Sequence, residues 1–157
     1  TYAPQAQKKN LYLHAQVAPD LPQVTTSRLY FKEIMQNFIT NAIKYTPSGG
    51  VTVIAQLAND HTLQIGVRDT GIGISKSELN KVYEKFWRSE DPYTRQTSGT
   101  GLGLFITAKL AKRIGAQLNL ESELKKGSTF SLLLPVVAVK DVDVKNLVKE
   151  EVQHLYE

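Results

Sequence analysis

The sequence contains no cysteine among its 157 residues, and only one Met and one Trp. The absence of Cys excludes a disulfide scaffold, a zinc site built from thiolates and a catalytic thiol. The three histidines, His14, His61 and His154, are too far apart for the sequence spacing of metal ligands. No stretch approaches about 18 consecutive apolar residues, so we expect neither a transmembrane helix nor a signal peptide.

Neither sign of charge dominates the chain, since 19 Lys and Arg residues stand against 15 Asp and Glu residues, for a net charge of +4. This balance fits an anionic ligand, while a mixed-charge surface accounts for most of the lysines. No basic run with interleaved aromatics is present, so we expect no nucleic-acid partner. Hydrophobic residues make up 41% and charged residues 22%, which excludes wholesale disorder and suits one domain with a sizeable core.

Apolar periodicity predicts a mixed α+β chain. We expect strands at residues 11–17, 51–56, 63–69, 117–121 and 128–134, and helices at residues 27–44, 75–83 and 102–114. Antiparallel hairpins dominate over a regular strand–helix alternation. The pattern therefore predicts a two-layer α/β sandwich, in which helices cover one face of a mixed, mostly antiparallel sheet.

The sequence predicts that both ends of the chain lie outside the main domain. The first residue is Thr1 rather than Met, so we expect a fragment in which residues 1–10 form a linker from an absent upstream region. Residues 11–135 would be the main domain. Residues 136–157 would be a partly helical extension with an apolar side formed by Leu147, Val148, Val152 and Leu155.

The predicted helix at residues 27–44 carries two asparagines on one polar stripe. At about 100° per residue, Asn37, Asn41 and Lys44 fall on one narrow polar stripe outside the apolar face. The alternative interpretation is that this stripe is an ordinary solvent-exposed face. Asn is a poor helix former, so two Asn residues on such a face would be unusual. An Asn amide can offer its oxygen to a cation and its NH₂ to a phosphate, and Lys44 adds a positive charge.

A glycine-rich segment begins at Asp69, directly after the strand at residues 63–69, with Gly71 and Gly73 close behind. A carboxylate there can point into a pocket floored by bare backbone. It could accept a hydrogen bond from an exocyclic amine such as that of adenine. The alternative is a simple turn that starts with Asp.

Three glycines at alternate positions, Gly99, Gly101 and Gly103, lead into the helix at residues 102–114. Such a segment lets backbone N–H groups approach phosphates at a positive helix terminus. The spacing matches neither the dinucleotide fingerprint nor a P-loop. A flexible hinge explains one or two of these glycines but not three. The 13 residues of the segment 89–101 have no apolar period, which is typical of a functional loop.

Together, in this order, the motifs resemble the ATP-binding catalytic domain of bacterial sensor histidine kinases. These belong to the GHKL superfamily with the Bergerat fold, which also holds gyrase, mismatch-repair and heat-shock chaperone ATPases. The matching segments are the N box, the first glycine box, the F box, the second glycine box and the last turn of the family, at residues 37–47, 69–74, 86–88, 99–104 and 127–130. The resemblance covers residues 11–135.

The resemblance implies a site for Mg²⁺ and ATP. Asn41, helped by Asn37, would ligate Mg²⁺, and Lys44 would contact phosphate. Arg88, at the root of a lid formed by residues 89–100, would reach the γ-phosphate. These four side chains would act in catalysis.

The same resemblance implies a base pocket in which Asp69 accepts a hydrogen bond from the adenine amine and Tyr45 packs beside the base. The remaining nucleotide contacts would come from Gly71, Gly73, Ile74, Thr100, Gly101, Leu102, Gly103, Leu104 and Thr129.

Asn37 separates branches of the superfamily. The ATPase branches carry Glu four residues before the metal-binding Asn, whereas Asn37 cannot act as a base. An attacking imidazole brings its own lone pair, so the resemblance implies transfer of the γ-phosphate to a His. The alternatives are a nucleotide-gated ATPase or chaperone-like switch, and an interaction module that has lost ATP.

The resemblance implies that the acceptor His lies on a separate dimerisation domain and passes phosphate to a response regulator in a two-component system. His14 has a Pro five residues later, but Ala15 stands where an acidic neighbour is expected. We therefore expect His14 to be a strand residue. A cytoplasmic location and no membrane contact by this segment are also expected.

Overall fold

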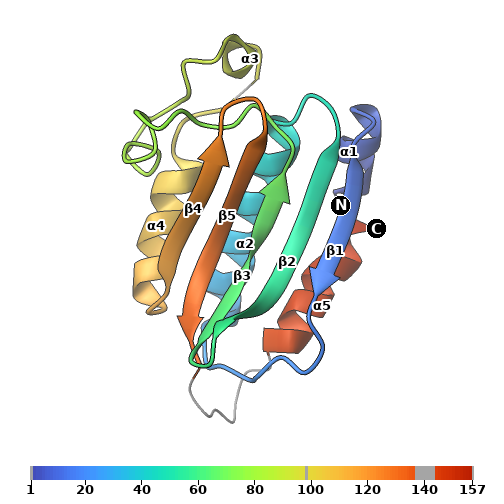
Figure 1. The fold of residues 1–157 in the computed structure, drawn as a ribbon, viewed down its shortest axis with the longest axis vertical. Helices are drawn as coiled ribbons and strands as arrows, with labels where there is room; N and C mark the ends of the chain where they lie inside the picture. The colour runs from blue at the N-terminus through green and yellow to red at the C-terminus, as the bar shows by residue number, and fades with distance from the viewer. Residues whose placement is uncertain (1, 98, 137–143, 157) are drawn as a thin grey trace.

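The computed structural model describes residues 2–97, 99–136 and 144–156, in which five strands form one sheet (Figure 1). The order across the sheet is β1–β2–β3–β5–β4. Its strands are β1 (Tyr12–Val17), β2 (Gly50–Asn59), β3 (Thr62–Asp69), β4 (Gln117–Glu123) and β5 (Gly127–Pro135). β1 pairs in parallel with β2, and the other pairings are antiparallel. The predicted mixed, mostly antiparallel sheet is confirmed.

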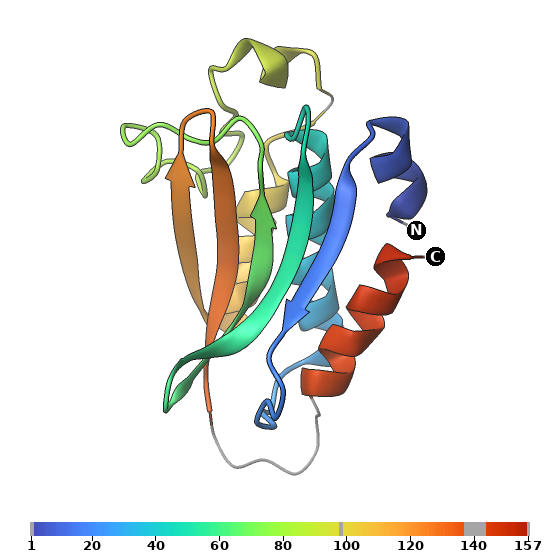
Figure 2. The same cartoon turned by 45° about the vertical axis from the view of Figure 1, so that its right-hand side comes forward.

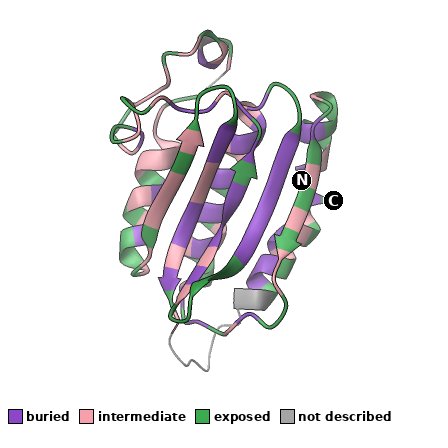
Figure 3. Ribbon diagram, viewed as in Figure 1, coloured by how far each residue is buried: buried purple, intermediate pink, exposed green. Residues whose placement is uncertain are grey.

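Helices α2 (Arg28–Lys44), α4 (Gly103–Arg113) and α5 (Val144–Leu155) lie on one face of the sheet (Figures 1 and 2). Among the described residues no helix covers the opposite face. The core is continuous between the two layers, and the central strands are more buried than the edge strands β1 and β4 (Figure 3). The predicted two-layer sandwich is therefore confirmed.

Helix α2 is the central element of the helical layer, and its sequence explains its limits. The Ser27 side chain caps the first turn by accepting a hydrogen bond from the Tyr30 N–H. The buried face consists of Phe31, Ile34, Met35, Phe38, Ile39, Ala42 and Ile43. Burying this face against β2 and β3 leaves the asparagine stripe on another side, toward α4.

The N-terminal segment differs from the linker predicted for residues 1–10. It contains helix α1 (Ala3–Lys8), and the side chains of Tyr2 and Ala6 are buried in the main core. A six-residue helix with polar flanks has little local signal. Tertiary burial of two apolar groups holds it in place.

Residues 75–83 also differ from prediction, because they form successive turns rather than a helix. The Ser75 hydroxyl donates to a carboxylate oxygen of Glu78 at 3.3 Å. The backbone bonds join residues three apart, from Glu78 to Ser75 and from Lys81 to Glu78, and no helical ladder follows. Ile74 and Val82 are buried at either end and fix the path of the segment.

The C-terminal helix α5 packs on this domain through Leu147, Val148 and Leu155, with Val152 partly buried beside them. The predicted apolar side is thus confirmed, and it joins the same core. Arg28 on α2 pairs with Glu150 at 2.7 Å across this contact. Within the described part of the chain, no helix combines the length and apolarity that a membrane span requires.

Candidate functional site

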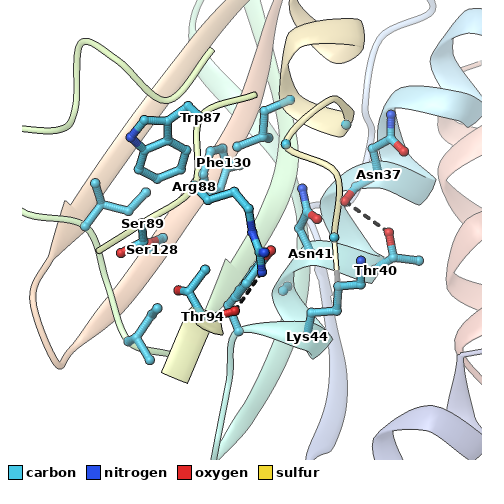
Figure 4. A pocket seen from close by; sticks show the side chains of 18 of the residues that line it. Asn37, Thr40, Asn41, Lys44, Trp87, Arg88, Ser89, Thr94, Ser128 and Phe130 are labelled. Carbon is cyan, nitrogen blue, oxygen red and sulfur yellow. Dashed lines mark hydrogen bonds between the residues drawn. The ribbon is translucent and has the colours of Figure 1, made fainter. Parts of the chain in front are cut away.

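A cavity of about 220 Å³ opens between the C-terminal half of α2, the end of β3 and the segment before α4 (Figure 4). It brings together most of the predicted site residues: Asn37, Asn41, Lys44, Tyr45, Asp69, Gly73, Ile74, Arg88, Thr100, Gly101, Gly103 and Leu104. Short helix α3 (Pro92–Arg95) lies in the loop that borders the cavity, and Thr94 is part of the wall. Four motifs that are distant in the sequence therefore surround one space.

The two asparagines on α2 differ in how they are held. The Asn37 Nδ2 donates to the hydroxyl of Thr107 on α4 at 3.1 Å, and Thr107 is fully buried. This bond orients the amide and leaves its oxygen available. Asn41 lines the cavity, and no hydrogen bond from its amide to another described residue is present. Its oxygen is free for a cation and its NH₂ for an anion.

The carboxylate of Asp69 is held at the other end of the cavity. Its Oδ1 accepts hydrogen bonds from the backbone N–H groups of Gly71 at 2.8 Å and Ser128 at 3.2 Å. Burial raises the pKa of Asp69 to about 6, and the two backbone hydrogen bonds partly oppose that rise. At neutral pH the ionised group can therefore accept a further hydrogen bond on Oδ2.

Close packing of the backbone requires both glycines after Asp69, of which only Gly73 also lines the cavity. A Cβ on Gly71 would press on the carbonyl oxygen of Tyr45. Gly73 has a φ of +69°, and a Cβ there would overlap the carbonyl of Glu123. The loop is tied back to α2 by the Ile72 N–H, which donates to the Tyr45 carbonyl at 3.1 Å. Gly71 shapes the pocket from behind, while Gly73 is part of its wall.

Two serines on the last strands lie next to Asp69 and Ile74, and no local sequence pattern predicted them: Ser128 lines the cavity, and Ser122 supports it from behind Ile74. The Ser122 hydroxyl accepts from the Ile74 N–H at 2.7 Å and lies 2.7 Å from the Ser128 hydroxyl. Thr129, which was predicted to contact the nucleotide, is not in the lining, whereas its neighbours Ser128 and Phe130 are. Side chains alternate along a strand, so a one-residue step moves the contact to the opposite face.

Arg88 contacts the loop in this structure. Its Nη2 donates to the carbonyl of Thr94 at 2.6 Å and to that of Thr97. Its Nε and the Thr94 hydroxyl are buried and have no partner among the described residues. The guanidinium therefore holds the predicted lid at its base, and contact with a phosphate stays a prediction.

The second glycine box ends where α4 begins. Gly101 has a φ of +75°, and a Cβ there would lie 2.6 Å from the Phe86 carbonyl carbon. Leu102, the N-cap residue of α4, has no side-chain cap hydrogen bond and does not line the cavity. The first N–H groups of this 11-residue helix thus lack a side-chain acceptor next to Gly103, which suits an anion.

Further residues line the cavity without an individual role having been predicted for them: Thr40, Ala42, Ile72, Trp87, Ser89, Thr94, Gly99 and Phe130, of which Ser89, Thr94 and Gly99 belong to the predicted lid. Among the described residues that line the cavity, Asp69 is the only carboxylate. The described residues contain no group of three or more His, Asp or Glu side chains that could hold a metal. A divalent cation would therefore depend on amide oxygens and on oxygens of the ligand, which are hard donors that suit Mg²⁺.

Residues 26–138 match the model of the family described as histidine kinase-, DNA gyrase B- and HSP90-like ATPases. The chain is 37% identical over 131 residues to the sensor histidine kinase AtsR of Burkholderia thailandensis, covering 82% of this chain and 22% of that protein. It is 36% identical over 139 residues to the aerobic respiration control sensor protein ArcB of Escherichia coli, covering 87% of this chain and 18% of that protein. The chain thus spans about a fifth of the length of these curated relatives.

Two solved structures share this fold. The fold matches full-length ShkA in complex with AMPPNP with a TM-score of 0.77 and 27% identity, over 88% of this chain and 28% of that one. It also matches the mycobacterial sensor histidine kinase MprB with a TM-score of 0.72 and 24% identity, over 87% of this chain and 91% of that one. This chain belongs to the histidine kinase-, DNA gyrase B- and HSP90-like ATPase family, as a catalytic, ATP-binding domain of the sensor histidine kinase type.

Proposed function

We propose that this domain binds ATP with Mg²⁺ and presents the γ-phosphoryl group to a histidine on a separate domain. The lining of the cavity favours transfer of the γ-phosphoryl group over hydrolysis of ATP. Asp69, the only carboxylate among the described lining residues, is engaged by two backbone N–H groups at the base end. At the other end, none of the described lining residues is a carboxylate that could activate a water molecule.

The two ends of the cavity suit the two ends of ATP. Asp69 would accept the hydrogen bond of the adenine amine, with Ile74 and Tyr45 against the ring. At the other end, Lys44 and the start of α4 provide positive charge for the phosphates. This arrangement orients the nucleotide by hydrogen bonds at one end and by charge at the other.

The asparagines fit a Mg²⁺ ion bound together with the nucleotide. Asn41 would supply an amide oxygen, and Asn37, fixed by its bond to Thr107, would support the metal and the phosphates. When bound, the ion neutralises charge on the phosphate oxygens. Arg88 would leave the carbonyls of the lid to reach the γ-phosphate.

None of the three histidines lines the cavity. His14 lies on β1 and stacks on Tyr12, with 4.3 Å between ring centroids. The phosphoacceptor is therefore proposed to be a histidine of a dimerisation and phosphotransfer domain, with a response regulator as the next acceptor. This proposal places the domain in the cytoplasm, where ATP is available.

The single tryptophan offers a direct test, because Trp87 lines the cavity. Titration with ATP should change its fluorescence in a saturable, Mg²⁺-dependent way, while steady-state release of phosphate stays near background. Adding the phosphoacceptor domain with labelled ATP should produce acid-labile, base-stable phosphohistidine. Rapid ATP hydrolysis by the domain alone would favour an ATPase, and failure to bind ATP would refute the proposal.

A further inference from the structure

Lys9 lies outside every motif described above, yet its ammonium group contacts two parts of the nucleotide site. Its Nζ donates hydrogen bonds to the backbone carbonyls of Ile43 at 2.6 Å and Lys44 at 2.9 Å. The same nitrogen lies 5.2 Å from the centroid of the Tyr93 ring, within the range of a cation–π contact. Lys9 therefore connects the end of α2 with lid helix α3.

The backbone around Lys9 is fixed on both sides. Before it, Tyr2 and Ala6 are buried in the core, and the Ala6 carbonyl accepts hydrogen bonds from Lys9 and Leu11. After it, the Tyr12 N–H donates to the Gly49 carbonyl at 3.0 Å, where β1 joins the sheet. The side chain thus extends from a packed base rather than from a free terminus.

The carbonyls that Lys9 binds belong to the last turn of α2, where carbonyls have no partner within the helix. A cation at this end also interacts favourably with the helix dipole. The same turn carries Lys44 and leads into Tyr45, and both side chains line the cavity. The position of this turn therefore sets the positions of two side chains of the site.

The second contact acts on the lid. Tyr93 precedes Thr94, which lines the cavity and whose carbonyl accepts a hydrogen bond from Arg88. The lid is thus attached at two points, to Arg88 at its base and to Lys9 on the N-terminal segment. Arg88 comes from the F box, whereas Lys9 comes from a segment that precedes β1.

We propose that Lys9 is a positioning residue of the nucleotide site, which holds lid helix α3 against the last turn of α2 at the phosphate end of the cavity. This inference rests on the proposed function, because the consequence concerns ATP. The lid and Lys44 serve the triphosphate, and Asp69, which serves the base, is held by Gly71 and Ser128 and not by Lys9. Loss of Lys9 should therefore weaken binding of the triphosphate more than binding of the base. A residue that merely stabilised α2 would affect all adenine ligands alike.

The test compares Lys9→Met with Lys8→Met, because Lys8 is exposed on α1 and makes neither contact. Lys9→Met should weaken ATP binding roughly 5- to 30-fold while leaving adenosine binding within about twofold. Lys9→Arg, which keeps the charge and the donors, should restore most of the affinity. Equal losses for ATP and adenosine, or equal behaviour of the two Met variants, would overturn the proposal.

A double-mutant cycle separates the lid contact from the α2 contact. Tyr93→Leu removes the ring, whereas Tyr93→Phe keeps it and should bind ATP normally. Lys9→Met combined with Tyr93→Leu should lose less ATP affinity than the product of the single losses, because the two residues act together. Independent, multiplicative losses would show that Lys9 does not act through the lid.

Hydrogen exchange of residues 92–97 in the absence of nucleotide distinguishes failure of this inference from failure of the proposed function. Lys9→Met should speed exchange there at least severalfold relative to Lys8→Met. Unchanged exchange would overturn the role of Lys9. If exchange responds but the unmutated domain binds no ATP, the proposed function fails, and the assignment of Lys9 to a nucleotide site fails with it.

Discussion

Asp69 and Ser128 are 59 positions apart in the sequence, and the Ser128 N–H donates a hydrogen bond of 3.2 Å to Asp69 Oδ1. The Gly71 N–H occupies the same oxygen at 2.8 Å. Two backbone donors thus fix one oxygen of a buried carboxylate, and Oδ2 is left for the ligand. In the proposed function, recognition of the base would depend on Oδ2, because Oδ1 is already occupied.

Asp69→Asn should stabilise the ligand-free domain at neutral pH. A carboxyl whose pKa is about 6 when folded and 3.8 when unfolded binds more protons in the folded state between those values. Its contribution to stability is therefore present below pH 3.8 and is lost as pH rises through about 6. Above that pH the buried, ionised carboxylate destabilises the folded state. Asn carries no charge and avoids this cost, so the free energy of unfolding should rise by roughly 1–3 kcal/mol at about pH 7.5.

The same substitution should abolish recognition of the base. Its amide oxygen would keep the two backbone hydrogen bonds, which turns the NH₂ toward the cavity, where it cannot accept from an amine. ATP and ADP affinities should fall by similar factors, roughly tenfold or more. Urea unfolding as a function of pH and ligand titration measure the two effects. A larger stability gain at pH 3.5 than at pH 7.5, or loss of ATP binding alone, would contradict this assignment.

Substitution of the two asparagines of α2 should affect stability and ATP binding differently. Asn41→Ala removes no hydrogen bond to a described residue, so the free energy of unfolding should change by less than about 0.5 kcal/mol while Mg²⁺-dependent ATP affinity is lost. Asn37→Ala leaves the buried Thr107 hydroxyl without that partner and should cost roughly 1–2 kcal/mol. Urea unfolding and ATP titration with and without Mg²⁺ measure both. Full Mg²⁺ dependence in Asn41→Ala would place the metal elsewhere.

Gly101→Ala and Gly103→Ala form a matched pair. Gly101 has a left-handed φ of +75° and no room for a Cβ beside Phe86, so Ala should destabilise the domain by roughly 1–3 kcal/mol. At Gly103 the nearest atom to a Cβ is Asn41 Nδ2 at 3.9 Å, and Ala favours the helix. Thermal unfolding should therefore change little for Gly103→Ala. Equal losses would show that the backbone at Gly101 is not strained by a side chain.

Glu151 on α5 is fully buried, and neither of its oxygens has a partner among the described residues. Burial raises its pKa, the charges of His154 and Lys32 oppose the rise, and Glu150 adds to it. The folded state then loses stability as pH rises above 4.5. Glu151→Met should raise the free energy of unfolding by roughly 1–3 kcal/mol at about pH 8, with a smaller gain at about pH 4.

Glu150→Gln is the control for this prediction. Glu150 is on the surface, where hydrogen bonds from Lys32 and Arg28 lower its pKa. Its loss should slightly destabilise the attachment of α5, with the opposite sign to Glu151→Met. A destabilising Glu151→Met, or a gain that does not depend on pH, would show that the carboxylate has a stabilising partner.

Local patterns were sufficient for the regular elements. Apolar alternation predicted all five strands, and the three long helices follow from 3.6-residue periodicity and, for α2, the Ser27 cap. Local patterns did not predict the structure of segments whose local preference is weak or is overridden by tertiary contacts. Helix α1 depends on burial of Tyr2 and Ala6, and residues 75–83 have a cap pairing but no helix to follow it.

The chemistry of the site is already readable in the sequence, which shows the segments that carry Asn41, Lys44, Asp69 and the glycines, and their order. The partners of these residues became visible only in the folded chain. Ser122, Ser128 and Lys9 reach the site through β4, β5 and the N-terminal helix. The reason is physical, because a motif records residue types at short spacing. A hydrogen bond from Lys9 to Lys44 depends on how α1 and α2 pack, and no local pattern encodes that.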